Sequence, residues 1–305
     1  MGWPLRTGKK FREFGGSFIY PMGDKMVSIG IVVGTDFADA TLSVHDLLQK
    51  MKLHPLIKPI LDGGKRVQWG AKAIPEGGYY SLPKKLNLPG AVILGDAAGM
   101  VNVPALKGIH YAMESGIMAA ETIFEQLKAG ANLHATDALA SYDARVRASH
   151  IAKELHEVRN MRQAFHHGFF VGGFLAGLMT LTKGAFPGGM WTSPADAAQS
   201  VFMGNEIYPK PDKILTFDKL DSVYLAGNRS RDDQPNHIRI QTQVSETVGQ
   251  SWISMCPAAV YEWKGDAKTE IQINPSNCVQ CGAITAKGGR LTLPEGGSGP
   301  EYTVM

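Results

Sequence analysis

Three cysteines near the carboxyl end of the chain have a spacing suited to a metal centre. Cys256 is followed by Pro257, and Cys278 and Cys281 form a C-x-x-C pair. A C-x-x-C loop lets two thiolates reach adjacent irons of an iron-sulfur cluster, while a separate Cys-Pro segment supplies a ligand from another direction. A further cysteine three residues on would continue the run, but that position is Ile284. The pattern favours an iron-sulfur site with an incomplete ligand set, and a zinc site completed by histidine or three free thiols is the alternative.

A second candidate site is the short loop from Gly95 to Gly99, with the sequence GDAAG. The Asp96 carboxylate at the end of a strand can accept hydrogen bonds from ribose or ribityl hydroxyls. The small residues after it let backbone amides approach a pyrophosphate at the start of a helix. A plain strand-to-helix turn with an exposed aspartate explains the loop equally well, so its neighbouring elements decide between the two.

The segments on either side of this loop predict a strand before it and a helix after it. Residues 91–94 are an apolar run typical of a buried strand. Beyond the loop, apolar residues recur at helical spacing up to Gly130, a residue favoured just past a helix end. They are Ile109, Met113, Ile117, Ala120, Phe124 and Leu127. Strand, glycine loop and helix in this order indicate a cofactor-binding unit, and a second helix is predicted over about 137–164.

The remaining elements predict an α+β fold. In the first 80 residues, the runs 17–20, 26–33 and 65–73 alternate with glycine turns and predict an antiparallel sheet. A short helix over 45–52 is followed by prolines at 55 and 59, which end or interrupt it. The composition changes after Trp191, which places a domain boundary near 195–215. Short strands are predicted at 238–244, 269–273 and 290–293.

Length, charge and composition exclude several classes of protein. A chain of 305 residues suggests about two domains. With 31 Lys+Arg against 28 Asp+Glu, the net charge of +3 is too small to indicate nucleic-acid binding. The 35 glycines fit tight turns and close cofactor approach. Three cysteines, all beyond residue 255, are not a disulfide framework and favour a reducing compartment. No secretion signal is visible.

One uncharged stretch, residues 163–182, raises the question of membrane contact. Its apolar part is only 169–181 and contains three glycines, whereas a bilayer-spanning helix needs about 20 mostly apolar residues. It fits either a segment at the membrane surface or a buried core helix. The apolar residues are Phe165, Phe169, Phe170, Phe174, Leu175, Leu178, Met179 and Leu181, flanked by the basic residues Arg159, Arg162 and Lys183.

Short blocks along nearly the whole chain carry a family resemblance. They include Gly2-Trp3-Pro4-Leu5, Gly15-Gly16-Ser17-Phe18, Gly63-Gly64-Lys65-Arg66, Gly77-Gly78, Val101-Asn102-Val103-Pro104, Lys107-Gly108, Tyr208-Pro209-Lys210-Pro211, Asp232-Asp233-Gln234-Pro235, Cys256-Pro257-Ala258, Asn277-Cys278 and Pro294-Glu295-Gly296-Gly297. In this number and order they resemble the carboxyl-terminal half of the electron transfer flavoprotein-ubiquinone oxidoreductase family.

The resemblance implies an electron-transferring-flavoprotein dehydrogenase that passes electrons from reduced electron transfer flavoprotein through FAD and a 4Fe-4S cluster to ubiquinone. It implies a monotopic enzyme on the mitochondrial inner membrane or the cytoplasmic face of a bacterial inner membrane. The expected fold has an antiparallel quinone-binding sheet (1–80) and the carboxyl-terminal part of an FAD domain with a membrane-surface segment (81–195). A ferredoxin-like iron-sulfur domain (210–305) would follow.

Site residues follow from the resemblance position by position. Gly15 and Gly16, in the family's G-G-S turn, and Gly108, in its K-G turn, would line the quinone headgroup, where a side chain would block backbone contact with a quinone carbonyl. Ordinary turn glycines are the alternative. Gly95 and Asp96 match an FAD-contacting loop. Cys256, Cys278 and Cys281 match three of the four cluster ligands. No residue is expected to perform acid-base catalysis.

Two departures from the family pattern shape the expectation. The family opens with a dinucleotide-binding strand, a G-x-G-x-x-G turn and a helix, which this sequence lacks, so we expect a fragment, a truncated reading frame or one part of a split enzyme. Because Ile284 interrupts the C-x-x-C-x-x-C run, a cubane would need a non-cysteine ligand; a three-iron form or no cluster are the other outcomes. The alternatives in function are a related quinone-linked dehydrogenase with another donor, or a non-catalytic zinc-stabilised fragment.

Overall fold

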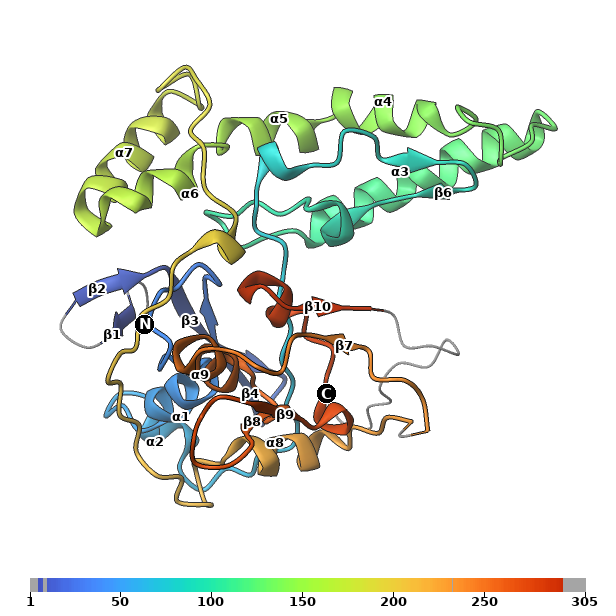
Figure 1. Ribbon diagram of the computed structural model, residues 1–305. Helices are drawn as coiled ribbons and strands as arrows, with labels where there is room; N and C mark the ends of the chain where they lie inside the picture. The colour runs from blue at the N-terminus through green and yellow to red at the C-terminus, as the bar shows by residue number, and fades with distance from the viewer. Residues whose placement is uncertain (1–4, 8–9, 232, 293–305) are drawn as a thin grey trace. The chain divides into compact units, whose positions relative to one another are not determined.

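A computed structural model describes residues 5–7, 10–231 and 233–292 of the chain (Figure 1). The chain folds into two compact units. The first combines Met1–Ala73 with Pro194–Met305, and the second is Ile74–Ser193. In the described ranges, each pairing between named strands is antiparallel and each sheet has two strands. Helices together with small antiparallel sheets confirm the predicted α+β class.

The first unit begins with two hairpins and a capped helix. Strand β1 (Leu5–Thr7) pairs with β2 (Lys10–Glu13), and β3 (Gly15–Met22) pairs with β4 (Met26–Val33). Gly23, with a φ of +68°, supplies the left-handed residue of the β3–β4 turn. Helix α1 (Val44–Lys52) starts where the Ser43 hydroxyl accepts the N–H of Asp46, and α2 (Lys58–Leu61) carries Pro59 in its first turn. The predictions of strands at 17–20 and 26–33 and of a helix at 45–52 are confirmed.

The strand predicted over 65–73 is wrong. This segment forms no strand, because its backbone and side chains bond to scattered loops. The Ala73 N–H donates to the carbonyl of Cys281 at 2.7 Å, and the Lys72 ammonium donates to the carbonyl of Gln280 at 3.0 Å. The apolar alternation here reflects packing against those loops rather than a sheet.

The carboxyl-terminal part of the first unit alternates short helices and strands. They are η4 (Asp196–Ala198), α8 (Lys219–Ala226), β7 (Ile238–Arg239), α9 (Glu246–Met255), β8 (Tyr261–Trp263), β9 (Ile271–Ile273), η5 (Pro275–Asn277), η6 (Ala283–Lys287) and β10 (Arg290–Leu291). Strand β8 pairs with β9 and β10 with β7. The predicted strands at 238–244, 269–273 and 290–293 are present but shorter, and position 293 lies outside the described residues.

The second unit is mostly helical. It contains η1 (Tyr79–Ser81), β5 (Asn87–Leu88), β6 (Ala91–Val92), η2 (Gly95–Ala98), α3 (Ile109–Lys128), α4 (Ala140–Ala148), α5 (His150–Glu157), α6 (Met161–Ala164), η3 (Phe165–His167) and α7 (Phe169–Leu181). The single helix predicted over 137–164 is three helices. Ser149 adopts extended backbone with a ψ of 172° and its hydroxyl accepts the N–H of Ile151, which ends α4 and starts α5.

One prediction about burial in the second unit needs correction, and the exposed face of α3 is a further finding. The strand predicted as buried over 91–94 is the two-residue β6, where Ala91 is exposed and the next residues are half-buried. Strand β5 covers only one edge of it. Helix α3 lies where it was predicted, but its apolar stripe is exposed: Ile109 by 79%, Met113 by 66%, Ile117 by 58%, Phe124 by 66% and Leu127 by 58%. The residues that α3 buries are Tyr111, Ser115, Ala119 and Thr122, on the side where α4 runs alongside it (Figure 1).

Candidate functional site

A β-hairpin brings the two cysteine-bearing segments together. Cys256 caps the carboxyl end of α9 and precedes β8, while β9 leads to Cys278 and Cys281. Because β8 and β9 are antiparallel, the segment before β8 and the segment after β9 emerge at the same end of the hairpin. The Asn277 amide donates to the carbonyl of Ala259 at 3.1 Å and ties the two segments to each other.

The thiols lie in a buried core and are free of disulfides. Cys256 and Cys278 are buried, and Cys281 is half-buried. Each sulfur accepts a backbone N–H: from Val260 at Cys256 (3.4 Å), from Gln280 at Cys278 (3.4 Å), and from Ala283 at Cys281. Amide donors stabilise a thiolate and, at iron-sulfur centres, contribute to the reduction potential.

Tyr261 interacts electrostatically with all three cysteines, which therefore lie near one another. Burial raises the pKa of Cys278 to about 12 and also raises the pKa of Cys281. Burial raises the pKa of Tyr261, and negative charge on Cys256, Cys278 and Cys281 raises it further. A buried thiolate without a counter-charge is costly, so these sulfurs suit a metal centre that binds them deprotonated. Tyr261 was not predicted as a site residue, because a tyrosine in an apolar strand resembles an ordinary core residue.

Backbone strain accompanies the cysteine loops. Ala259 and Gln280 have φ values of +51° and +48°, in the left-handed region that non-glycine residues rarely adopt. Each such residue costs on the order of 1 kcal/mol and is typical of ligand-binding loops. The strain at Ala259 directly precedes the N–H that donates to Cys256, and Gln280 is itself the donor to Cys278.

The residues present fit an iron-sulfur cluster only in part. The three thiols share one core, interact electrostatically and carry amide donors, but the full sequence contains no fourth cysteine. Within the described ranges, no three His, Cys, Asp or Glu side chains are grouped so as to bind one metal ion. A zinc site made by three such side chains is therefore not preformed in that part of the chain.

The GDAAG loop lies directly against α3. Gly95 has a φ of +55°, and a Cβ added there would lie 2.9 Å from the Cβ of Ala112. Its N–H donates to the hydroxyl of Ser115, which is fully buried, at 3.1 Å. Only glycine permits this approach. Ser115 was not predicted as a site residue. Its position on the side of α3 opposite the apolar stripe is the sequence signal that could have identified it.

The structure brings Gly108 next to this loop. Gly108 is the N-cap of α3, and a Cβ added there would lie 3.2 Å from the Asp96 carboxylate and 3.1 Å from the carbonyl oxygen of Met100. Gly95, Asp96 and Gly108 therefore form one cluster beside the amino-terminal part of α3, with the Asp96 side chain exposed.

Gly15 and Gly16 belong to the other unit. They are the first two residues of β3, where they pair with Val33 and Val32 and are half-buried. The G-G-S block is therefore strand rather than the turn expected from the sequence. Gly15 and Gly16 lie in the first unit and Gly108 lies in the second.

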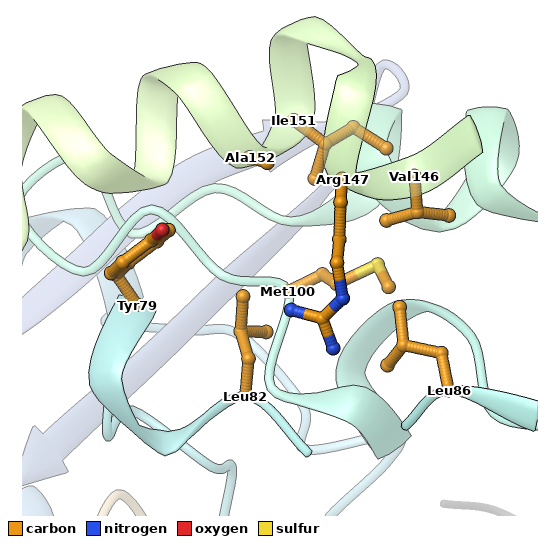
Figure 2. A pocket seen from close by; sticks show the side chains of 8 residues that line it. All are labelled: Tyr79, Leu82, Leu86, Met100, Val146, Arg147, Ile151 and Ala152. Atoms are coloured by element: carbon orange, nitrogen blue, oxygen red, sulfur yellow. The ribbon is translucent and has the colours of Figure 1, made fainter. Parts of the chain in front are cut away.

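A cavity in the second unit belongs to core packing. Its volume is about 80 Å³, roughly half that of an engineered cavity of about 150 Å³ that admits benzene, so it is too small for a flavin or a quinone headgroup. Figure 2 shows its lining residues: Tyr79, Leu82, Leu86, Met100, Val146, Arg147, Ile151 and Ala152. The Arg147 guanidinium among them is already bonded to the carbonyls of Pro83 and Lys84 and to the Asp143 carboxylate.

Helix α7 exposes most of its apolar surface. Phe170, Phe174 and Leu181 are 86%, 68% and 82% exposed, while Met179 packs in a small core with Met161. Within this chain α7 is therefore not a core helix. None of the helices in the described ranges combines the length and the apolar composition needed to span a bilayer.

Both ends of the chain match models of one protein family. Residues 1–74 match the model described as ETF-QO, ubiquinone-binding, and residues 213–303 match the model described as electron transfer flavoprotein-ubiquinone oxidoreductase, 4Fe-4S. The first covers the β3–β4 hairpin and the second covers all three cysteines.

Similarity to curated proteins extends over the whole chain. It is 38% identical to the mitochondrial electron transfer flavoprotein-ubiquinone oxidoreductase of Caenorhabditis elegans, with 100% of this chain and 54% of the relative aligned. Identity to the human mitochondrial protein is 36%, with 100% and 52% aligned. A probable mitochondrial member from Saccharomyces cerevisiae is 38% identical, with 100% and 53% aligned. The chain spans about half the length of these relatives.

The two family models, the alignment over all of this chain and the convergence of the three cysteines agree with one another. The chain belongs to the electron transfer flavoprotein-ubiquinone oxidoreductase family and corresponds to its carboxyl-terminal part.

Proposed function

We propose that the protein carrying this chain is an electron-transferring-flavoprotein dehydrogenase that passes electrons from reduced electron transfer flavoprotein, through FAD and an iron-sulfur cluster, to ubiquinone. The observation that carries the proposal is the set of three thiols that the β8–β9 hairpin gathers, each with an N–H donor. Transfer of electrons through flavin and cluster needs no acid-base group, and the two protons that a fully reduced quinone takes up come from water. The protein's contribution is to set distance, potential and solvent access.

Each part of the chain has a place in this proposal. Residues 1–80 form the ubiquinone-binding region, 81–195 the carboxyl-terminal part of the FAD domain with a membrane-surface segment, and 210–305 the ferredoxin-like domain. Cys256, Cys278 and Cys281 hold the cluster, which supplies one-electron transfer when bound. Their burial keeps water from the sulfurs, and their amide donors stabilise the thiolate state.

The flavin contact is proposed at Gly95 and Asp96. The exposed Asp96 carboxylate would accept hydrogen bonds from a ribose or ribityl hydroxyl, and Gly95 brings the loop directly against α3. The exposed apolar stripe of α3 supports the same assignment, because a helix in a flavin domain buries such a stripe against a sheet. The curated relatives are about twice as long as this chain, which leaves ample polypeptide to supply that cover.

The quinone contacts are proposed at Gly15 and Gly16 in the first unit and at Gly108 in the second. At Gly108 the support is its position beside Asp96, since quinone reduction requires the headgroup to lie near the electron donor. At Gly15 and Gly16 the support is the match of residues 1–74 to the ubiquinone-binding model. Absence of a side chain at these positions lets backbone groups reach a quinone carbonyl.

Membrane attachment is proposed through α7. A ubiquinone with an isoprenoid tail resides in the bilayer, so its enzyme needs an apolar surface there. The exposed Phe170, Phe174 and Leu181 provide one, and Lys183 just beyond the helix suits anionic headgroups. The proposed location is a mitochondrial inner membrane, since the named relatives are mitochondrial proteins, or the cytoplasmic face of a bacterial inner membrane.

The test uses the natural protein that carries this chain, loaded with FAD. Reduced electron transfer flavoprotein should reduce its flavin, and a soluble ubiquinone analogue should then reoxidise it. Gly108→Ala should slow quinone reduction at least several-fold and leave flavin reduction intact. The matched control is Gly116→Ala in α3, where an added methyl group meets nothing within 4 Å. Failure of the FAD-loaded protein to reduce the quinone would refute the proposal, and equal loss of both steps in Gly108→Ala would refute that residue's role.

A further inference from the structure

The position that would supply a fourth cluster ligand is occupied by a tightly packed isoleucine. Ile284 lies in η6, three residues after Cys281, and is only 3% exposed. It belongs to the same hydrophobic core as Cys256 and Cys278. A Cβ added at Gly289 would lie 2.4 Å from the Ile284 Cγ1 atom, so that glycine exists to accommodate this side chain. Ile284 is therefore an integral core residue and offers no lone pair to a metal.

The alternative to an open corner is a non-cysteine fourth ligand. The full sequence has no fourth cysteine. His237 is buried, and its Nε2 atom has no hydrogen-bond partner in the described part of the chain. It is therefore the residue to test as a fourth cluster ligand.

The chemistry of the cluster then selects its composition. In a cubane each of four irons needs one ligand besides its three sulfides. With three cysteines, one iron would have no thiolate ligand, and the buried Ile284 at the matching position of the motif has no lone pair to offer it. A three-iron, four-sulfide cluster needs three thiolates and leaves its open corner without a metal. Because no metal at that corner needs a ligand, an isoleucine can occupy the position beside it.

We infer that Cys256, Cys278 and Cys281 bind a three-iron, four-sulfide cluster in this protein, with Ile284 closing the corner that a fourth iron would occupy. The inference rests on the proposed cluster function and names its cofactor. Electron transfer through the site stays possible, because such a cluster also exchanges one electron.

Electron counting gives a test that does not depend on activity. Three ferric irons hold an odd number of electrons, so the oxidised three-iron cluster gives an electron paramagnetic resonance signal that one-electron reduction abolishes or moves to integer spin. An oxidised cubane holds an even number and is silent until reduced. Anaerobically prepared natural protein should show the first behaviour, with about three irons and about four sulfides per cluster.

Substitution at Ile284 provides the decisive comparison. Ile284→Cys should raise the iron content from about three to about four per cluster, remove the oxidised signal and create one on reduction. Ile284→Ala, which removes the side chain without adding a thiolate, should keep the three-iron spectrum. His237→Ala should keep it as well.

Two results would overturn the inference. An unsubstituted protein that is silent when oxidised and carries about four irons holds a cubane, and loss of that cubane in His237→Ala would identify the histidine as its ligand. Either finding leaves the proposed quinone reduction standing. A protein free of iron and sulfide refutes the cluster itself, whereas failure of quinone reduction with an intact three-iron spectrum refutes only the proposed function. The paramagnetic resonance spectrum and iron content of the unsubstituted protein test the inference even if a variant fails to fold.

Discussion

Gly95→Ala should destabilise the second unit by about 1–4.5 kcal/mol. Gly95 has a φ of +55°, and an L-residue in the left-handed region costs about 1–2 kcal/mol. The new methyl group would meet the Ala112 Cβ at 2.9 Å and its Cα at 3.2 Å, and relieving such overpacking costs typically about 1–3 kcal/mol. Alanine also restricts the unfolded chain, which returns about 0.4–1 kcal/mol. The net loss therefore remains large.

The matched control is Gly116→Ala, in the middle of the same helix that Gly95 contacts. An added methyl group there meets nothing within 4 Å, and alanine is favoured over glycine in a helix by about 0.5–1 kcal/mol. Urea unfolding followed by far-ultraviolet circular dichroism measures both free energies. Gly116→Ala should raise the stability while Gly95→Ala lowers it. If Gly95→Ala stays within about 0.5 kcal/mol of the parent protein, the size of an ordinary surface substitution, the close approach of the loop to α3 is wrong.

Three further predictions concern pH, membrane binding and the cysteine loops. Burial lowers the pKa of His45, whose ring hydrogen-bonds a backbone carbonyl at 2.9 Å, so below about pH 6.5 the unfolded state takes up a proton that the folded state does not. Stability should fall on acidification by at most about 1.4 kcal/mol per pH unit from this group, and thermal melts of His45→Gln should show a shallower fall; an unchanged slope would contradict this. Phe170→Ser with Phe174→Ser on α7 should weaken binding to phosphatidylserine vesicles by about tenfold or more, since partial burial of each ring contributes about 1 kcal/mol. Phe124→Ser, an equally exposed ring on α3, should not, and equal sedimentation of both variants would argue against the α7 surface. Asn277→Ala should cost about 0.5–1.5 kcal/mol, because it removes the hydrogen bond between the two cysteine segments; urea unfolding measures it, and no loss would mean that the bond is dispensable.

Local signals in the sequence predicted several elements correctly. The hairpin strand over 26–33 and the helix over 45–52 depend on nearby residues: a glycine that can adopt a left-handed turn at Gly23, and a hydroxyl at Ser43 that caps the first helical turn. The cysteine spacing likewise predicts a thiolate centre, because ligand type and local spacing are properties of the chain itself. The failure over 65–73 has the opposite cause, since its hydrogen-bond partners are loops near residue 280 that no local pattern reveals.

By itself, then, the sequence determined which residues can turn, cap and bind metal, because those capacities reside in single side chains and their nearest neighbours. Only the tertiary structure decided that the segments carrying Cys256 and Cys278 meet at one end of the β8–β9 hairpin, that Gly108 lies against Asp96, and that the stripe of α3 is exposed. It also decided that Ile284 fills its corner of the core. The physical reason is that contacts between residues distant in the chain depend on how whole elements pack, and periodicity within one element does not specify its partner.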